Sequence, residues 1–257
     1  MTLNLEKAKE CLLKMEISTE SPTYQHYAKV LLGSIKPALI SLVLMVGVVT
    51  FLTVFQELGL INHVDIWGSL VAYPLGFVLM AYWQFQSNWP GLERNWAEMA
   101  RYFRFPKVPS TLLWSVSVLS IPLVVPIIAR LTGDPGGGSS FNDMSTAHQT
   151  GWWAVGILIL TSCIAVPLVE EYVSRHLVLD RLRLVFGGVA AVIISAILFA
   201  LGHVLYLGHP TGIIQVFLLG LIAGGARVQT KSLWGAIAVH STYNSAVTIA
   251  LFHELLK

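Results

Sequence analysis

The chain has 257 residues, of which 55% are hydrophobic and only 12% are charged, with a formal net charge of +2 at pH 7. Soluble domains carry about 25% charged residues, so this composition excludes an ordinary soluble domain and favours a membrane protein. Since the basic residues lie between apolar runs, we expect them to anchor the chain at a lipid bilayer, and we expect no nucleic-acid partner.

Seven apolar runs are long enough to cross a bilayer, which takes about 17–25 helical residues. We therefore expect an all-α polytopic transmembrane bundle of about seven to eight spans. A cytosolic N-terminal arm, residues 1–30, is expected to precede a membrane-embedded domain of residues 31–257. The expected spans are residues 35–55, 66–85, 112–131, 152–169 with an extension, 185–201, 213–228 and 233–252.

The distribution of Lys and Arg predicts the orientation of these helices. If the N-terminus is cytoplasmic, every basic residue except Arg130 and Lys257 falls on the cytoplasmic side. The outer loops, residues 56–65 and 203–212, contain none, as the positive-inside rule requires. A further outer loop is expected at residues 133–151, which are rich in Gly and Ser. The chain is thus predicted to be a multi-pass integral membrane protein with a cytoplasmic N-terminus.

A first polar cluster follows the fourth apolar run. Residues 151–169 contain no ionised side chain, and Glu170, Glu171 and Arg175 then come close together. A carboxylate in or beside hydrocarbon is costly and usually serves a site that faces the bundle interior. On a helix, Glu171 and Arg175 are one turn apart and can pair, whereas Glu170 is rotated by about 100°. We therefore expect Glu170 to remain free to act as a general base.

Two histidines lie on the segments that follow. Phe199 and His203 share a helix face, and so do His240 and Asn244, which could direct two donors at one oxyanion. If the fourth helix continues to about residue 183 and the chain turns near residues 186–188, Glu170 and His203 both lie roughly 24 Å from that turn. His240 and Asn244 lie about 12 and 18 Å from the next turn on the same side. These side chains are therefore expected to meet in one buried cavity.

Proline and glycine residues add two local expectations. Pro167 precedes the glutamates and is expected to kink or loosen their helix and to admit water to them. Gly220, Gly224 and Gly225 form a face of small residues that allows a neighbouring helix to approach closely.

These motifs resemble the CAAX-processing and bacteriocin-immunity family of intramembrane glutamate proteases, which includes the type II CAAX prenyl endopeptidases. The resemblance covers about residues 166–247, and it suggests a protease-like core at about residues 151–257. The matching motifs are Glu-Glu-x-x-x-Arg at Glu170, Glu171 and Arg175, Phe-x-x-x-His at Phe199 and His203, and His-x-x-x-Asn at His240 and Asn244.

The resemblance implies hydrolysis of a peptide bond without a cofactor. Glu170, helped by His203, would activate a water molecule, and His240 and Asn244 would stabilise the oxyanion. Supporting positions would be taken by Glu171, Arg175 and Phe199. The implied substrate is a membrane-associated peptide or a lipidated protein, including one with a prenylated C-terminus.

Three alternatives remain open at this point. Glu170, His203 and His240 could bind zinc, although the chain lacks a His-Glu-x-x-His helix. The chain could instead be a non-catalytic membrane adaptor or an immunity or regulatory protein that keeps these residues as a polar core. A proton-coupled transporter is the third alternative, but neither an internal repeat nor paired broken helices are apparent. A free carboxylate beside two histidines favours catalysis.

Overall fold

The computed structural model describes residues 104–134, 138–203 and 209–257, together with single positions between residues 32 and 59. The described residues contain helices and no strand, in agreement with the predicted all-α class. The expected N-terminal arm and the expected spans at residues 35–55 and 66–85 lie outside the three described ranges. In chain order, the helices are α6 (Val108–Val118), α7 (Ser120–Thr132), α8 (Gly138–Thr150), α9 (Trp152–Leu160), η2 (Thr161–Ala165), α10 (Val166–Glu171), η3 (Tyr172–Leu179), α11 (Asp180–Gly202), α13 (Pro210–Thr230) and α14 (Leu233–Leu255).

Three helical stretches among the described residues are long and apolar enough to cross a membrane: Val108–Thr132, Trp152–Gly202 and Pro210–Thr230. They contain four of the predicted spans, and α14 matches the position of a fifth. The predicted total of seven to eight spans also depends on residues outside the described ranges. These apolar helices support an integral membrane protein.

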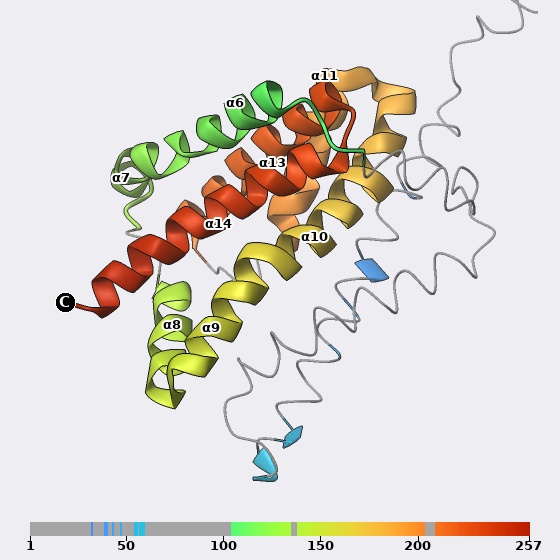
Figure 1. Cartoon of the computed structure of the whole chain (residues 1–257). Helices are drawn as coiled ribbons and strands as arrows, with labels where there is room; N and C mark the ends of the chain where they lie inside the picture. Colours follow the sequence, from blue (N-terminus) through green and yellow to red (C-terminus); the bar gives the residue numbers. More distant parts are fainter. Residues whose placement is uncertain are drawn as a thin grey trace, which may run out of the picture.

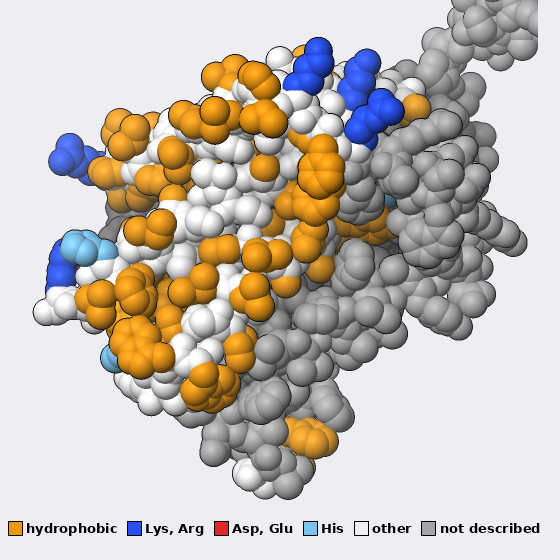
Figure 2. All heavy atoms as spheres, viewed as in Figure 1, with side chains coloured by type: hydrophobic (Ala, Val, Ile, Leu, Met, Phe, Trp, Pro, Cys, Tyr) orange, Lys and Arg blue, Asp and Glu red, His pale blue; other side chains and the backbone are white. Residues whose placement is uncertain are grey.

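The outer surface of the described helices is apolar. Hydrophobic side chains cover the visible face over α6, α7, α9 and α14, and Lys and Arg side chains lie near its borders (Figure 2). Leu113 is 67% exposed, Leu123 77% and Ile249 70%. Side chains of this kind on the outside of a helical bundle are suited to contact with lipid.

The stretch Trp152–Gly202 folds back on itself at Gly187. This residue has φ 74° and ψ −179°, a backbone conformation that is essentially restricted to glycine. Val178 and Leu182, before the turn, pack in one buried cluster with Ala191, after it. The predicted extension of the fourth helix and the predicted turn at residues 186–188 are therefore confirmed.

Glycines bring α13 close to its neighbours. A Cβ atom added at Gly220 would lie 3.0 Å from the Cα of Ala196 in α11, and one at Gly224 would lie 3.0 Å from a methyl group of Val192. These separations leave almost no room for a side chain. The predicted close helix approach is thus confirmed.

Helix α14 runs antiparallel to the long segment that contains α9, η2, α10 and η3. Near its start, Leu233 and Ile237 pack with Tyr172 and Leu177. Near its end, the residues that pack against Ala154 and Val155 are Leu251, Phe252 and Leu255. The helix contacts α13 and α6, and it also contacts η2 and α10 of the long segment (Figure 1). This arrangement brings His240 of α14 to the glutamates of α10.

One local expectation is wrong. Most of the predicted loop at residues 133–151 is helical, because α8 occupies Gly138–Thr150. Met144 and Ala147 are buried against Ala154 and Val155, so tertiary packing stabilises a helix that its Gly- and Ser-rich start does not favour. The residues Gly133 and Gly151, both with positive φ, bracket this part of the chain.

Candidate active site

Glu171 is the centre of a fully buried network. Its Oε2 atom accepts a hydrogen bond from Arg175 Nε at 2.7 Å, and its Oε1 atom lies 2.9 Å from His240 Nδ1. The side chains of Glu171 and Arg175 are both 0% exposed. Each carboxylate oxygen of Glu171 therefore has a partner, and the charges of Glu171 and Arg175 neutralise one another. The predicted pairing of Glu171 with Arg175 is present in the structure.

A serine that the sequence analysis did not single out completes this network. Arg175 Nη1 donates to Ser195 Oγ at 3.0 Å, and Ser195 Oγ donates to the backbone carbonyl of Ser174 at 3.0 Å. The guanidinium carbon of Arg175 also lies 5.1 Å from the centroid of the Phe199 ring. Ser195 lies one turn before Phe199 and two turns before His203, and it is the one polar residue in the apolar run from Leu184 to Gly202, which was the available signal.

Glu170 lies beside this network but is not part of it. Its Oε2 atom is 3.6 Å from His203 Nε2 and 4.0 Å from His240 Nε2. Both separations exceed hydrogen-bond length, and this buried oxygen has no hydrogen-bond partner among the described residues. With Glu171 already paired to Arg175, the charge of Glu170 is balanced only if one of the histidines is protonated.

Backbone and carboxylate acceptors set the orientation of both imidazole rings. His203 Nδ1 lies 2.8 Å from the carbonyl oxygen of Phe199, and His240 Nδ1 faces Glu171. Since a carbonyl or carboxylate oxygen only accepts, each Nδ1 carries a proton. Each ring therefore presents its Nε2 atom to Glu170. The Phe199 ring packs against both imidazoles, with centroid distances of 4.7 and 5.9 Å.

The helix that carries the two glutamates is wider than an α-helix on both sides of them. The π-helical segments η2 and η3 flank α10, and the N–H of Val166 donates to the carbonyl of Thr161, five residues earlier. π-helical turns are rare and are frequent at functional sites. The predicted loosening of the helix near Pro167 is present; access of water to the glutamates stays a prediction.

The hydrogen-bond partner of Asn244 is a backbone carbonyl and not another predicted site residue. The Nδ2 atom of Asn244 donates to the backbone carbonyl of Ser162 at 2.7 Å. The other six predicted residues, in contrast, are joined by the contacts described above. Whether Asn244 stabilises an oxyanion stays a prediction.

Glu170, His203 and His240 are the side chains that would bind the metal ion in the zinc alternative. Among the described residues, no group of three or more His, Cys, Asp or Glu side chains is arranged to hold one. The separations of 3.6 and 4.0 Å between Glu170 Oε2 and the two Nε2 atoms are slightly longer than the roughly 3.3 Å between neighbouring ligands of a tetrahedral zinc ion.

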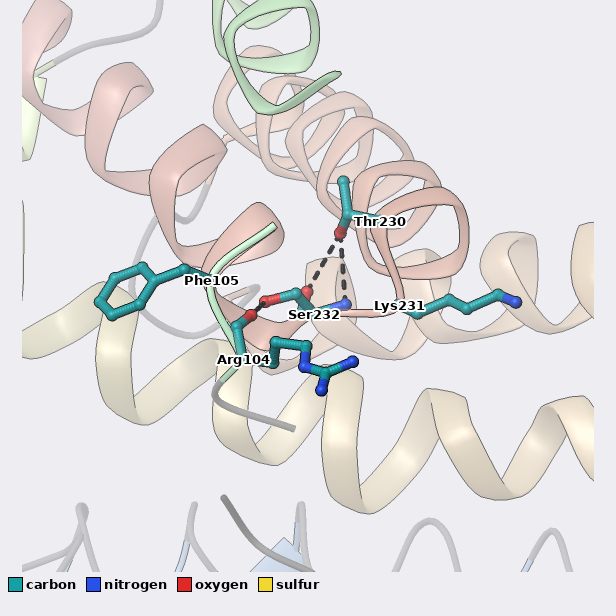
Figure 3. Close-up of a pocket in the computed structure, with 5 residues that line it drawn as sticks. All are labelled: Arg104, Phe105, Thr230, Lys231 and Ser232. Carbon is teal, nitrogen blue, oxygen red and sulfur yellow. Dashed lines mark hydrogen bonds between the residues drawn. The ribbon is translucent and has the colours of Figure 1, made fainter. Parts of the chain in front are cut away.

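A separate cavity lies at the turn between α13 and α14. It has a volume of about 360 Å³ and is lined by Arg104, Phe105, Thr230, Lys231 and Ser232 (Figure 3). Ser232 Oγ caps α14 and also donates to the carbonyl of Arg104. None of the predicted site residues lines this cavity.

Comparison with known proteins supports the family expected from the motifs. Residues 151–246 match the family model of the type II CAAX prenyl endopeptidases described as Rce1-like. The matched region includes every predicted site residue, from Glu170 to Asn244, and confirms the resemblance. No curated protein and no solved structure matches the chain. The family suggests a function of the CAAX-protease type.

Proposed function

We propose that the chain is an intramembrane endopeptidase. Residues 151–246 match the family model described as type II CAAX prenyl endopeptidase Rce1-like, which supports this proposal. The observation that carries this proposal is the position of Glu170. Its buried Oε2 atom faces two imidazole Nε2 atoms, and the neighbouring Glu171 is fully occupied by Arg175 and His240. A structural polar core would not need a second carboxylate without a hydrogen-bond donor of its own.

In the proposed first step, Glu170 activates a water molecule. The distances of 3.6 and 4.0 Å to the histidines are short enough for one water to contact the carboxylate and an imidazole together. Glu170 takes a proton from this water, and the hydroxide attacks the carbonyl carbon of the substrate. The neutral His203 ring, with its proton on Nδ1, can accept a second hydrogen bond from the water through Nε2.

The developing oxyanion needs hydrogen-bond donors. His240 can donate from Nε2 only as an imidazolium, because its Nδ1 proton is directed to Glu171. Asn244, one turn further along α14, is the proposed second donor. Collapse of the tetrahedral intermediate then breaks the carbon–nitrogen bond, and Glu170 returns its proton to the departing amine. No cofactor takes part in this scheme.

The proposed substrate is a membrane-associated peptide or lipidated protein. The matching family model is described as a CAAX prenyl endopeptidase, and the apolar outer surface of the helices is suited to a lipid-anchored chain. We therefore propose that cleavage requires a substrate that partitions into the membrane, with a prenylated C-terminus as the first candidate.

The proposal is tested by hydrolysis of a quenched fluorescent peptide by the purified protein in lipid nanodiscs. The comparison is between wild type, Glu170→Gln and Glu254→Gln, a matched change at a carboxylate that is 55% exposed on the last helix. Each variant is assayed with prenylated and unprenylated peptide, with and without a zinc chelator.

We expect cleavage of the prenylated peptide by wild type and by Glu254→Gln, and none by Glu170→Gln. Inhibition by the chelator, reversed by added zinc, would instead support the zinc alternative. An intact peptide in all samples, together with a cellular phenotype unaffected by Glu170→Gln, would favour a non-catalytic adaptor or immunity protein.

A further inference from the structure

Pro167 leaves one backbone carbonyl of the active-site helix without a helical donor. In an α-helix, the carbonyl of Ser162 would accept from the N–H of Val166, but that N–H donates to Thr161. In a π-helix, the Ser162 carbonyl would accept from the N–H of the residue five positions later. That residue is Pro167, which has no N–H. Both regular donors are therefore unavailable to the Ser162 carbonyl. An unpaired backbone carbonyl inside a membrane protein is costly.

Asn244 supplies the missing donor from another helix. Its Nδ2 atom lies 2.7 Å from the Ser162 oxygen. A side-chain amide has two N–H groups, so this bond uses one of them and leaves the other for a second acceptor. Asn244 also lies one helical turn, about 6 Å, beyond His240 on α14. The bond thus fixes an amide donor next to the histidine that contacts both glutamates.

We propose that Pro167 is a positioning residue for catalysis and that it acts through the Ser162 carbonyl on Asn244. By removing the helical donor, Pro167 makes this carbonyl an anchor for the Asn244 amide, whose second N–H then binds the oxyanion of the substrate. This inference rests on the proposed endopeptidase function. Alanine at position 167 restores a backbone N–H, which competes with Asn244 for the carbonyls of this turn and releases the amide from its fixed orientation.

The test is a double-mutant cycle with P167A, N244A and the double variant in the peptide assay. We expect N244A to lower kcat by about a hundredfold, as for loss of one oxyanion donor. P167A is expected to lower kcat by roughly tenfold with little change in KM, because the donor is present but misplaced. In the P167A background, N244A should cost clearly less than in wild type. P126A, the same change inside helix α7, is the matched control and should retain wild-type kcat.

The same cycle is measured by thermal unfolding, which does not depend on activity. We expect N244A to lower Tm more in the wild-type background than in the P167A background. With Pro167 present, N244A leaves the Ser162 carbonyl unpaired, whereas in P167A a backbone N–H can take the place of the amide. Additive effects on both kcat and Tm would overturn the proposal, and so would coupling in Tm with additive effects on kcat. If wild type cleaves no peptide, the endopeptidase function fails, while the Tm cycle still decides whether Pro167 acts on Asn244.

Discussion

The Nδ1 atom of His240 lies 2.9 Å from Oε1 of Glu171, a residue 69 positions earlier in the chain. Through this bond, the ion pair between Glu171 and Arg175 determines which nitrogen of His240 faces Glu170. The second glutamate of the pair thus orients a histidine and does not merely neutralise an arginine.

Loss of this bond should reduce turnover more than substrate binding. We expect Glu171→Ala to lower kcat on the order of a hundredfold with a small change in KM, because the His240 ring loses its fixed orientation. Glu171→Gln should lose less, since its amide oxygen still accepts the Nδ1 proton. Both kcat and KM are measured on the monodisperse fraction of each purified variant. Equal kcat for the two variants would contradict an orienting role for the oxygen of residue 171.

Removal of the buried guanidinium should destabilise the protein. Arg175→Gln leaves the carboxylate of Glu171, which is 0% exposed, without its guanidinium partner, and the expected loss of unfolding free energy is about 3–5 kcal/mol. Arg183→Gln is the matched control, because Arg183 is 35% exposed and lies 3.7 Å from Asp180, and it should cost less than about 1 kcal/mol. Unfolding in mixed micelles measures both. Similar losses of unfolding free energy for the two variants would show that the buried pair contributes no more to stability than the exposed one.

Two adjacent glycines at the turn before the second half of α11 should respond differently to alanine. Gly187 has φ 74° and ψ −179°, so Gly187→Ala forces strain of order 1–3 kcal/mol or a rearranged turn. Among the described residues, a Cβ atom at Gly188 would meet Val228 alone, at an ordinary 3.9 Å, and Gly188→Ala should be nearly neutral. Thermal unfolding of the two variants checks this order. The reverse order would mean that the turn is not centred on Gly187.

The contact between α13 and α11 predicts a similar contrast. Gly220→Ala should destabilise the protein by about 1–3 kcal/mol, because the added Cβ would lie 3.0 Å from the backbone of Ala196. Gly156 faces open space on α9, so Gly156→Ala should be neutral or should stabilise the helix by about 0.5–1 kcal/mol. Unfolding measurements of both variants, made in the same lipid and detergent, give the comparison. A stabilising Gly220→Ala would contradict the close packing.

Local sequence predicted the helices of the described residues and the residues of the candidate site. Apolar runs of membrane-spanning length predicted the helical spans within the described residues, because hydrophobicity and helix length are properties of a single segment. The one-turn spacing of Glu171 and Arg175 predicted their ion pair for the same reason, since both lie on one helix. The turn at Gly187 was also visible in the sequence, as two glycines between two apolar runs.

Tertiary structure alone decided which partners meet across helices. The bond of His240 to Glu171, the contact of Arg175 with Ser195 and the bond of Asn244 to Ser162 each join different helices. Such contacts depend on the rotation and relative depth of two packed helices, which residue spacing within either one does not specify. Helix α8 is present despite its Gly- and Ser-rich start, because its buried face packs on α9. The sequence therefore pointed to the chemical groups of the candidate site, and the packing of α14 against the π-helical segment decided which of them are paired.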